Sequence, residues 1–415
     1  MMLTRRDMVT TSLKSAALVG LSPTVPAFLA QTARAATARR DGRVLVVIQL
    51  DGGNDAINTL VPFADEGYAR NRKVLRVADK QLIRVNDRVG LHPALRDLGV
   101  LLDRGELALV PGVGYPNPNR SHFESMSIWQ TARLDLEDHG GPGWIGRSLD
   151  DQAKTSETAI AAGTASLYIG EGAPSPALRG RRAGAASLER IEDLTLPTGW
   201  DRSLMETRLG NQAEPNDSLK AYVRRSVLDA YACAERVDGL TRRNAASAAT
   251  YPDTGLAVRL RTIAQLLKAE LGARVFYTAQ SGYDTHAGQL NTHAGLLREL
   301  ATAIKAFMDD LTAARLSDRV TVMCFSEFGR RVAENGSAGT DHGTAGLLML
   351  AGPGVRPGLH GSVPSLTDLV DGDPKVSTDF RQVYAALLED WLSLPSLGAL
   401  GSRFEPMALF RSSPS

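Results

Sequence analysis

Short apolar runs that alternate with helical patterns constrain the fold of this chain more than any other feature. Residues 44–50 form a continuous and largely β-branched run, which is typical of a strand buried on both faces. Further strand-like runs lie at 274–279, 320–325 and 347–351, and a helical pattern spans 289–314. This alternation favours βαβ units, so we expect an α/β fold with a mostly parallel central sheet.

The remaining segments add weaker predictions. A helix is expected over 93–104 and a strand over 107–110. Ser121 is expected to cap a helix that runs to about Thr131, because Glu124 follows at the spacing of a capping box. Two further amphipathic helices are expected at 256–271 and 379–392.

The N-terminus has the features of a twin-arginine (Tat) export signal. Arg5-Arg6 precedes a long uncharged stretch, and residues 33–35 offer a small-x-small cleavage site. The apolar part is too short for a comfortable membrane span, although a retained N-terminal anchor is the alternative. We therefore expect a signal at 1–35, no stable membrane span after its removal, and a periplasmic or secreted protein. The mature domain would span 36–415, with an irregular insertion at about 171–253.

Charge and cysteine content exclude several classes of function. The formal net charge of +1 becomes −2 when residues 1–35 are removed, because that segment holds four basic residues and one acidic residue. A nearly neutral protein without long basic runs gives no electrostatic reason to expect a nucleic-acid partner. Only Cys233 and Cys324 are present, so neither a disulfide scaffold nor a cysteine zinc site is expected.

Carboxylate and imidazole side chains gather where the predicted strands end. Asp51 closes the first run, Asp284 and His286 follow the second, and Asp341 and His342 lie in a loop after the third. Ligands of open parallel sheets bind outside the carboxyl ends of the strands. We therefore predict one or two divalent ions. Among Zn²⁺, Mn²⁺, Mg²⁺ and Ca²⁺, a mixed Asp/His set suits Zn²⁺ or Mn²⁺ better than Ca²⁺, which prefers oxygen ligands. The alternative is a set of turn aspartates and surface histidines.

Ser121 is the candidate nucleophile. It follows a loop rich in Gly, Pro and Asn and opens a predicted helix, whose N-terminus would hold an anion. A serine there, beside divalent ions, suits in-line displacement at phosphorus or sulfur. Ser121 serves equally well as a helix cap alone.

Five motifs follow one another along the chain: LDGGND at 50–55, NRSHFE at 119–124, GYDTH at 282–286, FSEFGR at 325–330 and TDHG at 340–343. Together and in this order they resemble the DUF1501 family, an exported family related to the alkaline phosphatase/sulfatase superfamily. The resemblance covers nearly all of the predicted mature chain. It implies a three-layer α/β sandwich of the alkaline phosphatase type.

The superfamily pattern, carried over to this sequence, implies roles for six metal ligands and a nucleophile. Ser121 would be the nucleophile that bridges to the metals. One metal would be bound by Asp51, Asp341 and His342, and the second by Asp284, His286 and His360.

Two features depart from that pattern. Asp284 and His286 are two positions apart, whereas the superfamily often spaces its Asp and His by four, so His293 competes with His286 for the role. The Ser121 region also lacks the Cys-x-Pro-x-Arg pattern of sulfatases, which favours a phosphatase-like serine. Glu124 is the alternative group facing the metal.

Five further residues are candidates for anion binding or for supporting the ligands. Asn54 would do so unless it only forms a turn, and His122 would orient a ligand or donate to an anion. Glu327 would support or bind the metal, and Arg330 and Arg120 would hold the anion.

The leading prediction is an exported metal-dependent hydrolase that uses a serine nucleophile on a phosphate or sulfate ester, with a small anionic ester or glycan as substrate. The alternative is a non-catalytic envelope or carbohydrate-associated binding protein with a degraded metal site. A phosphate-transferring isomerase of the same superfamily is disfavoured, because such metabolism is usually cytoplasmic.

Overall fold

The computed structural model describes residues 42–135, 140–155, 166–181, 185–189, 239, 249–270 and 272–412. The predicted signal and most of the predicted insertion, including Cys233, lie outside these residues. Within them, no helix combines the length and apolar character needed to cross a bilayer.

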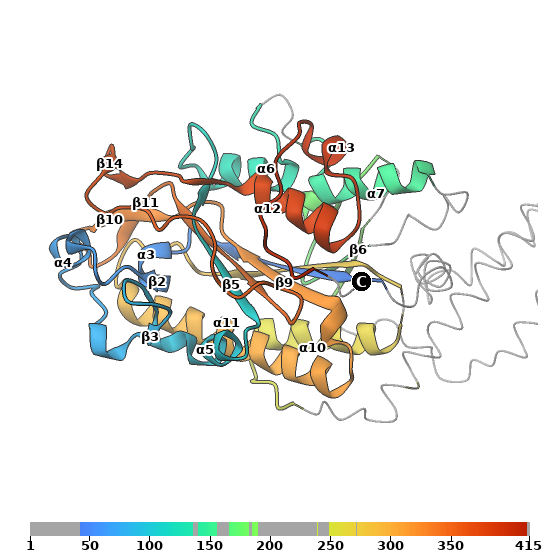
Figure 1. Ribbon diagram of the computed structural model, residues 1–415, viewed down its shortest axis with the longest axis horizontal. Helices are drawn as coiled ribbons and strands as arrows, with labels where there is room; N and C mark the ends of the chain where they lie inside the picture. The colour runs from blue at the N-terminus through green and yellow to red at the C-terminus, as the bar shows by residue number, and fades with distance from the viewer. Residues whose placement is uncertain are drawn as a thin grey trace, which may run out of the picture.

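A sheet of nine strands, counted among the described residues, forms the centre of the molecule (Figure 1). Its order is β13 (Gly358–Leu359), β5 (Leu107–Gly114), β12 (Gly346–Ala351), β9 (Val320–Phe325), β1 (Val44–Asp51), β8 (Val275–Ser281), β6 (Ser166–Ile169) and β7 (Ala186–Leu188), and β16 (Thr378–Asp379) also pairs with β5. Every pairing is parallel except the two made by β12. The predicted α/β fold with a mostly parallel sheet is confirmed.

Helices cover both faces of the sheet, which gives three layers (Figure 1). In β1, Val46 and Ile48 point to one core and Leu45 and Val47 to the other, because successive side chains of a strand alternate. One face is covered by α5 (Arg96–Asp103), α10 (Gly255–Lys268) and α11 (Gln289–Ala313). The other is covered by α6 (His122–Thr131), α7 (Trp144–Thr155), α12 (Phe380–Ala386) and α13 (Ser396–Leu400).

Aromatic packing fixes α6 against the sheet. Trp129 of α6 stacks on Phe380 with ring centroids 4.4 Å apart, and Trp144 stacks on Tyr384 at 4.0 Å. The indole N–H of Trp129 donates to the backbone carbonyl of Glu327 at 2.8 Å, which satisfies its polar group inside the core. The contacts of Trp129 therefore hold the last turn of α6 against α12 and against the segment that follows β9.

The direction of β12 differs from the expected parallel arrangement. Because it runs antiparallel to β5 and β9, its first residue lies at the edge where the other strands finish. A short hairpin of β10 (Arg330–Glu334) and β11 (Thr340–His342) leads into it. Asp341 and His342 are therefore not in an irregular loop that leaves a strand, as expected, but in a strand that precedes one.

Most predicted elements are confirmed, with small changes at their ends. The expected helix at 93–104 begins as a 3₁₀ turn at Pro93–Leu95, and the last one continues from α12 into a π-helix at Leu387–Trp391. Neither α7 nor β6 was predicted. The smaller elements are α3 (Ala56–Thr59), β2 (Leu60–Val61), α4 (Glu66–Asn71), a 3₁₀ turn (Asp79–Gln81), β3 (Ile83–Arg84), β4 (Gly90–Leu91), two more 3₁₀ turns (Pro176–Leu178 and Ser317–Arg319), β14 (Leu369–Val370) and β15 (Asp373–Pro374).

Candidate metal centre

A glycine turn at the end of β1 brings the strand ends together. Gly52 has φ +116°, and a Cβ there would lie 2.3 Å from the backbone nitrogen of Asp284. Only glycine fits this close approach. The Gly52 N–H also donates to Glu327 Oε1 at 3.0 Å, which fixes the segment after β9 to the same point.

Three side chains from distant segments converge at this edge. Ligand atoms of His122, Asp284 and His342 all lie within 4.8 Å of one another. His342 Nε2 is 3.2 Å from Asp284 Oδ1, and His122 Nε2 is 3.5 Å from Asp284 Oδ2. His286 adds a fourth donor, since its Nε2 lies 2.9 Å from His342 Nε2 and 3.1 Å from Asp284 Oδ1. We call these four residues the metal group.

Each histidine of the metal group is oriented through its other ring nitrogen. His342 Nδ1 donates to the Arg120 carbonyl at 2.8 Å, which can only accept. His122 Nδ1 lies 2.7 Å from Glu327 Oε1, and His286 Nδ1 lies 3.3 Å from Asp341 Oδ1. A proton on each Nδ1 leaves each Nε2 with a free lone pair, as in histidines that bind metals.

The unpartnered nitrogen of His122 tests whether a metal fits. His122 Nε2 is buried and, in the described part of the chain, has no hydrogen-bond partner. A buried polar atom without a partner is costly and needs an explanation. Three imidazole nitrogens and one carboxylate oxygen form a donor set that suits Zn²⁺, so the residues fit such an ion.

Electrostatics keep the carboxylate of the metal group ionised. Partial burial would raise the pKa of Asp284, but the hydrogen bond from Arg330, the contact with His342 and the charge of Arg330 outweigh it and lower the pKa to about 2. The hydrogen bond to Glu327 raises the pKa of His122 in the absence of a metal. Asp284 is thus ready to bind a cation at neutral pH.

Arg330 was predicted to bind an anion, but in the structure its guanidinium makes buried hydrogen bonds to the protein itself. Its side chain is fully buried and donates to the carbonyls of Gly53 at 2.6 Å, of Thr340 at 2.7 Å and of Gly52. It also donates to Asp284 Oδ1 at 2.7 Å. The guanidinium therefore ties the ends of β1 and β8 to β11 and has no face turned to solvent.

Asp51 and Asp341 lie near the metal group but outside it. Asp51 is partly buried at the end of β1 and accepts a hydrogen bond from the Gln49 amide. Burial raises the pKa of Asp51, and the negative charge of Glu327 adds to this effect. The Asp341 side chain is 57% exposed and contacts His286 Nδ1. Its carboxylate also accepts a hydrogen bond from the Asn335 amide at 3.1 Å.

His360 is placed away from the metal group. It follows β13, and its backbone N–H donates to the Leu109 carbonyl. Leu109 is five residues, or about 16 Å along the strand, short of the edge where β5 ends at Gly114. The His360 Nε2 lies 2.7 Å from the carbonyl of Arg356, four residues earlier, so the side chain contacts only its own turn of the chain.

Asn54 and His293 belong to a buried polar network. Asn54 Oδ1 lies 2.8 Å from His293 Nε2, and its amide group also bonds to Thr59. His293, on α11, is 2% exposed. The sequence did not separate this internal role from a place in the metal centre. Asn54 closely follows β1, and no local pattern shows that the side chain of His293 points into the core.

Ser121 is exposed and lies next to the metal group along the chain. It caps α6, and its Oγ accepts from the Glu124 N–H at 3.5 Å. Its chain neighbours are His122 and Arg120, whose carbonyl holds His342. The Glu124 carboxylate accepts from Asn119 instead of completing a reciprocal capping box.

His122 lies closer to the other candidate ligands than the sequence indicated. It was expected only to orient a ligand or bind an anion, whereas its ring forms one corner of the metal group. Its position at the start of a capped helix was visible in the sequence, but its approach to Asp284 depends on the packing of α6. Asn335, which holds Asp341, was not singled out by any pattern.

A pH dependence of stability follows from the buried histidines His92 and His293, whose rings lie 6.1 Å apart. Burial lowers the pKa of each to about 4, against the opposing charge of Asp55, and Arg72 and Arg330 lower that of His293 further. Because these values lie below the unfolded value of about 6.5, each histidine's contribution is complete above that pH and is lost as the pH falls towards 4. We expect the free energy of unfolding to drop by roughly 3 kcal/mol per histidine over this range.

Urea unfolding near pH 7 and near pH 4.5 measures this loss. The variant His293→Gln keeps a donor for Asn54 and should lose less stability on acidification than the wild type. An identical loss of stability on acidification in both proteins would show that His293 does not cause the pH dependence.

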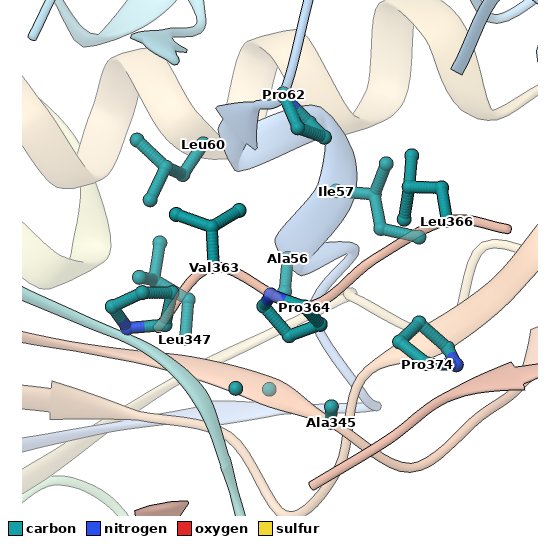
Figure 2. Close-up of a pocket in the computed structure, with 13 residues that line it drawn as sticks. Ala56, Ile57, Leu60, Pro62, Ala345, Leu347, Val363, Pro364, Leu366 and Pro374 are labelled. Atoms are coloured by element: carbon teal, nitrogen blue, oxygen red, sulfur yellow. The ribbon is translucent and has the colours of Figure 1, made fainter. Parts of the chain in front are cut away.

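A small apolar cavity lies elsewhere, between α3, the end of β5 and the start of β12 (Figure 2). Its volume is about 30 Å³, and none of its lining residues is charged. Leu60, Val363 and Pro364 lie around it in the view of Figure 2. A space of the size of one water molecule with such walls offers no place for an anionic ester.

Comparison with known proteins places the chain in a family. Residues 42–389 match the model of DUF1501, which is described as a protein of unknown function. No curated protein matches the chain. Solved structures that match it include three from bacteria, each at a TM-score of 0.35.

The first is the C-terminal periplasmic domain of EcEptC from Escherichia coli in complex with Zn, at 10% identity over 75% of this chain and 74% of that chain. The second is the lipoteichoic acid synthase LtaP from Listeria monocytogenes, at 11% identity over 82% and 76%. The third is the phosphonate monoester hydrolase SpPMH from Silicibacter pomeroyi, at 12% identity over 87% and 75%. Because the family model covers most of the chain, as the sequence motifs led us to expect, the protein belongs to the DUF1501 family.

Proposed function

We propose that this protein is an exported, metal-dependent hydrolase of phosphate or sulfate esters. The observation that carries the proposal is the convergence of three imidazole Nε2 atoms and the Asp284 carboxylate. Among the described residues, the buried His122 Nε2 of this group has no hydrogen-bond partner. A bound divalent ion supplies Lewis-acid polarisation of a phosphoryl or sulfuryl oxygen. The Tat signal proposed for residues 1–35 would carry the folded protein out of the cytoplasm.

Ser121 is the proposed nucleophile. Its Oγ would attack phosphorus or sulfur, the ester oxygen would leave as an alcohol after taking up a proton, and the serine proton would pass to water. Water would then cleave the serine ester and release phosphate or sulfate. The free N–H groups in the first turn of α6, which is ten residues long, would hold the anion during both steps.

A binding protein without turnover is the second candidate. It is favoured by the state of Ser121, whose Oγ already accepts the capping hydrogen bond of α6. In such a protein the metal group would bind an anionic ligand, for example on a glycan, and no covalent step would follow.

Metal content and turnover of nitrophenyl phosphate and nitrophenyl sulfate test the proposal. We expect one tightly held divalent ion per chain, and loss of at least about 100-fold in metal affinity on His342→Ala. His360→Ala is the matched control, because that histidine lies outside the metal group, and it should retain the ion. Ser121→Ala should retain the ion and lose turnover.

Each outcome separates the candidates. A wild-type protein that binds no divalent ion, or a His342→Ala variant that keeps it, contradicts the metal centre. An occupied metal centre without turnover of either ester selects the binding protein.

A further inference from the structure

Two arginines share one buried carboxylate beside the metal group. Asp373, in β15, is 1% exposed and forms an ion pair with Arg120 through Oδ2. Arg331 Nε lies 3.8 Å from Asp373 Oδ1, at the long end of an ion pair. Both arginine side chains are 38% exposed, so each is partly accessible to solvent. We call this group, Arg120 and Arg331 with the buried Asp373, the arginine pair, after its two guanidinium groups.

The arginine pair holds two guanidinium groups around one buried carboxylate. The exposed carboxylates of Asp341 and Asp371 also act on it, Asp341 on Arg331 and Asp371 on Asp373. Asp373 Oδ1 has no hydrogen-bond partner among the described residues. The planar fork of an arginine matches carboxylate, sulfate and phosphate groups. Because the buried carboxylate already holds the Arg120 side chain in place, an anion bound there would cost less ordering entropy than on a free surface arginine.

Three separate contacts fix the arginine pair next to the metal group. The Arg120 carbonyl accepts the hydrogen bond that orients His342. Thr344, two residues after His342, donates to the carbonyl of Pro374 at 2.7 Å and so holds β15. Arg331 follows Arg330, which pairs with His342 between β10 and β11.

We propose that the arginine pair is a second anion subsite, and that the substrate is an ester carrying a further anionic group near the one that is cleaved. This inference rests on the proposed function, because it takes the metal group as the place of the first anion. A multiply charged glycan or another polyanionic ester has this chemistry.

Binding of non-hydrolysable phosphonates to the metal-loaded protein tests the inference by calorimetry. Methylphosphonate carries the first anion alone, and phosphonoacetate, phosphonopropionate and phosphonobutyrate add a carboxylate at increasing reach. We expect the best of these to bind about tenfold more tightly than methylphosphonate. In Arg331→Gln, the ratio of the two affinities should fall to near one.

Lys375→Gln is the matched control, because Lys375 is an exposed cation close to Asp373 in the chain but is paired with Asp368. It should keep the affinity ratio of the wild type. Equal affinities in the wild type, or the same loss of the ratio in both variants, would overturn the subsite. A metal-loaded protein that binds none of the phosphonates would instead count against the proposed function itself.

Discussion

The variant Arg330→Met is expected to lose about 3–5 kcal/mol of unfolding free energy, which is a large share of the stability of a typical domain. The substitution keeps much of the apolar volume but removes every donor of the guanidinium. It leaves the carbonyls of Gly52, Gly53 and Thr340 without their buried partner. A buried acceptor that loses its donor costs about 1–3 kcal/mol.

The metal group should weaken together with the fold. Arg330 lies within 2.7 Å of Asp284 Oδ1 and helps to keep that carboxylate ionised. Unfolding is therefore measured by urea titration with a chelator present, so that metal loss does not contribute. Arg331→Met is the matched control, because its side chain is 38% exposed, and its cost should stay below about 1 kcal/mol. Equal stabilities of the two variants would show that the buried hydrogen bonds of Arg330 do not stabilise the fold.

The fold was predictable because burial leaves a local signature. The run at 44–50 reads as apolar on both faces, and β1 is covered on both faces in the structure. Asp284 and His342 could be predicted to meet because the segments that carry them follow strands that end at the same edge of the sheet, β8 and β9 on either side of β1. The direction of β12 could not be predicted, since an apolar run looks the same in both directions.

The parts of the site that the sequence did not predict depend on how side chains pack and on strand register, and not on which segments form strands. His122 enters the metal group only because Trp129 holds α6 against the segment that contains Glu327. The placement of His360 depends on the register of β13 against β5, which no local pattern encodes. Arg330 looked like an anion ligand because a sequence does not show whether a guanidinium points to solvent or to backbone carbonyls.

A buried ion pair holds the segment after β1 against the β10–β11 hairpin. Arg72 contacts both carboxylate oxygens of Asp55, at 2.5 and 3.1 Å, and neither side chain is exposed. Arg72 also donates to the carbonyls of Val332 at 2.7 Å and Arg331 at 2.9 Å. Burial would raise the pKa of Asp55, but the charge and hydrogen bonds of Arg72 prevail and lower the pKa to about 2.

A double-mutant cycle on Asp55 and Arg72 is expected to show strong coupling. Asp55→Asn and Arg72→Met should each cost about 3–5 kcal/mol, because each leaves one charge buried without its partner. The double variant should cost clearly less than the two together.

Because the folded pKa of Asp55 is depressed, its contribution to stability is present above the unfolded value of about 3.9 and is lost as the pH falls towards 2. Asp55→Asn should therefore lose less stability than the wild type between pH 4 and 2, a range below that of the buried histidines. Unfolding by guanidinium chloride at several pH values measures both the coupling of the two residues and the acid dependence. Additive costs in the cycle, or an acid dependence that is unchanged in Asp55→Asn, would show that the pair does not stabilise this edge of the sheet as the contacts indicate.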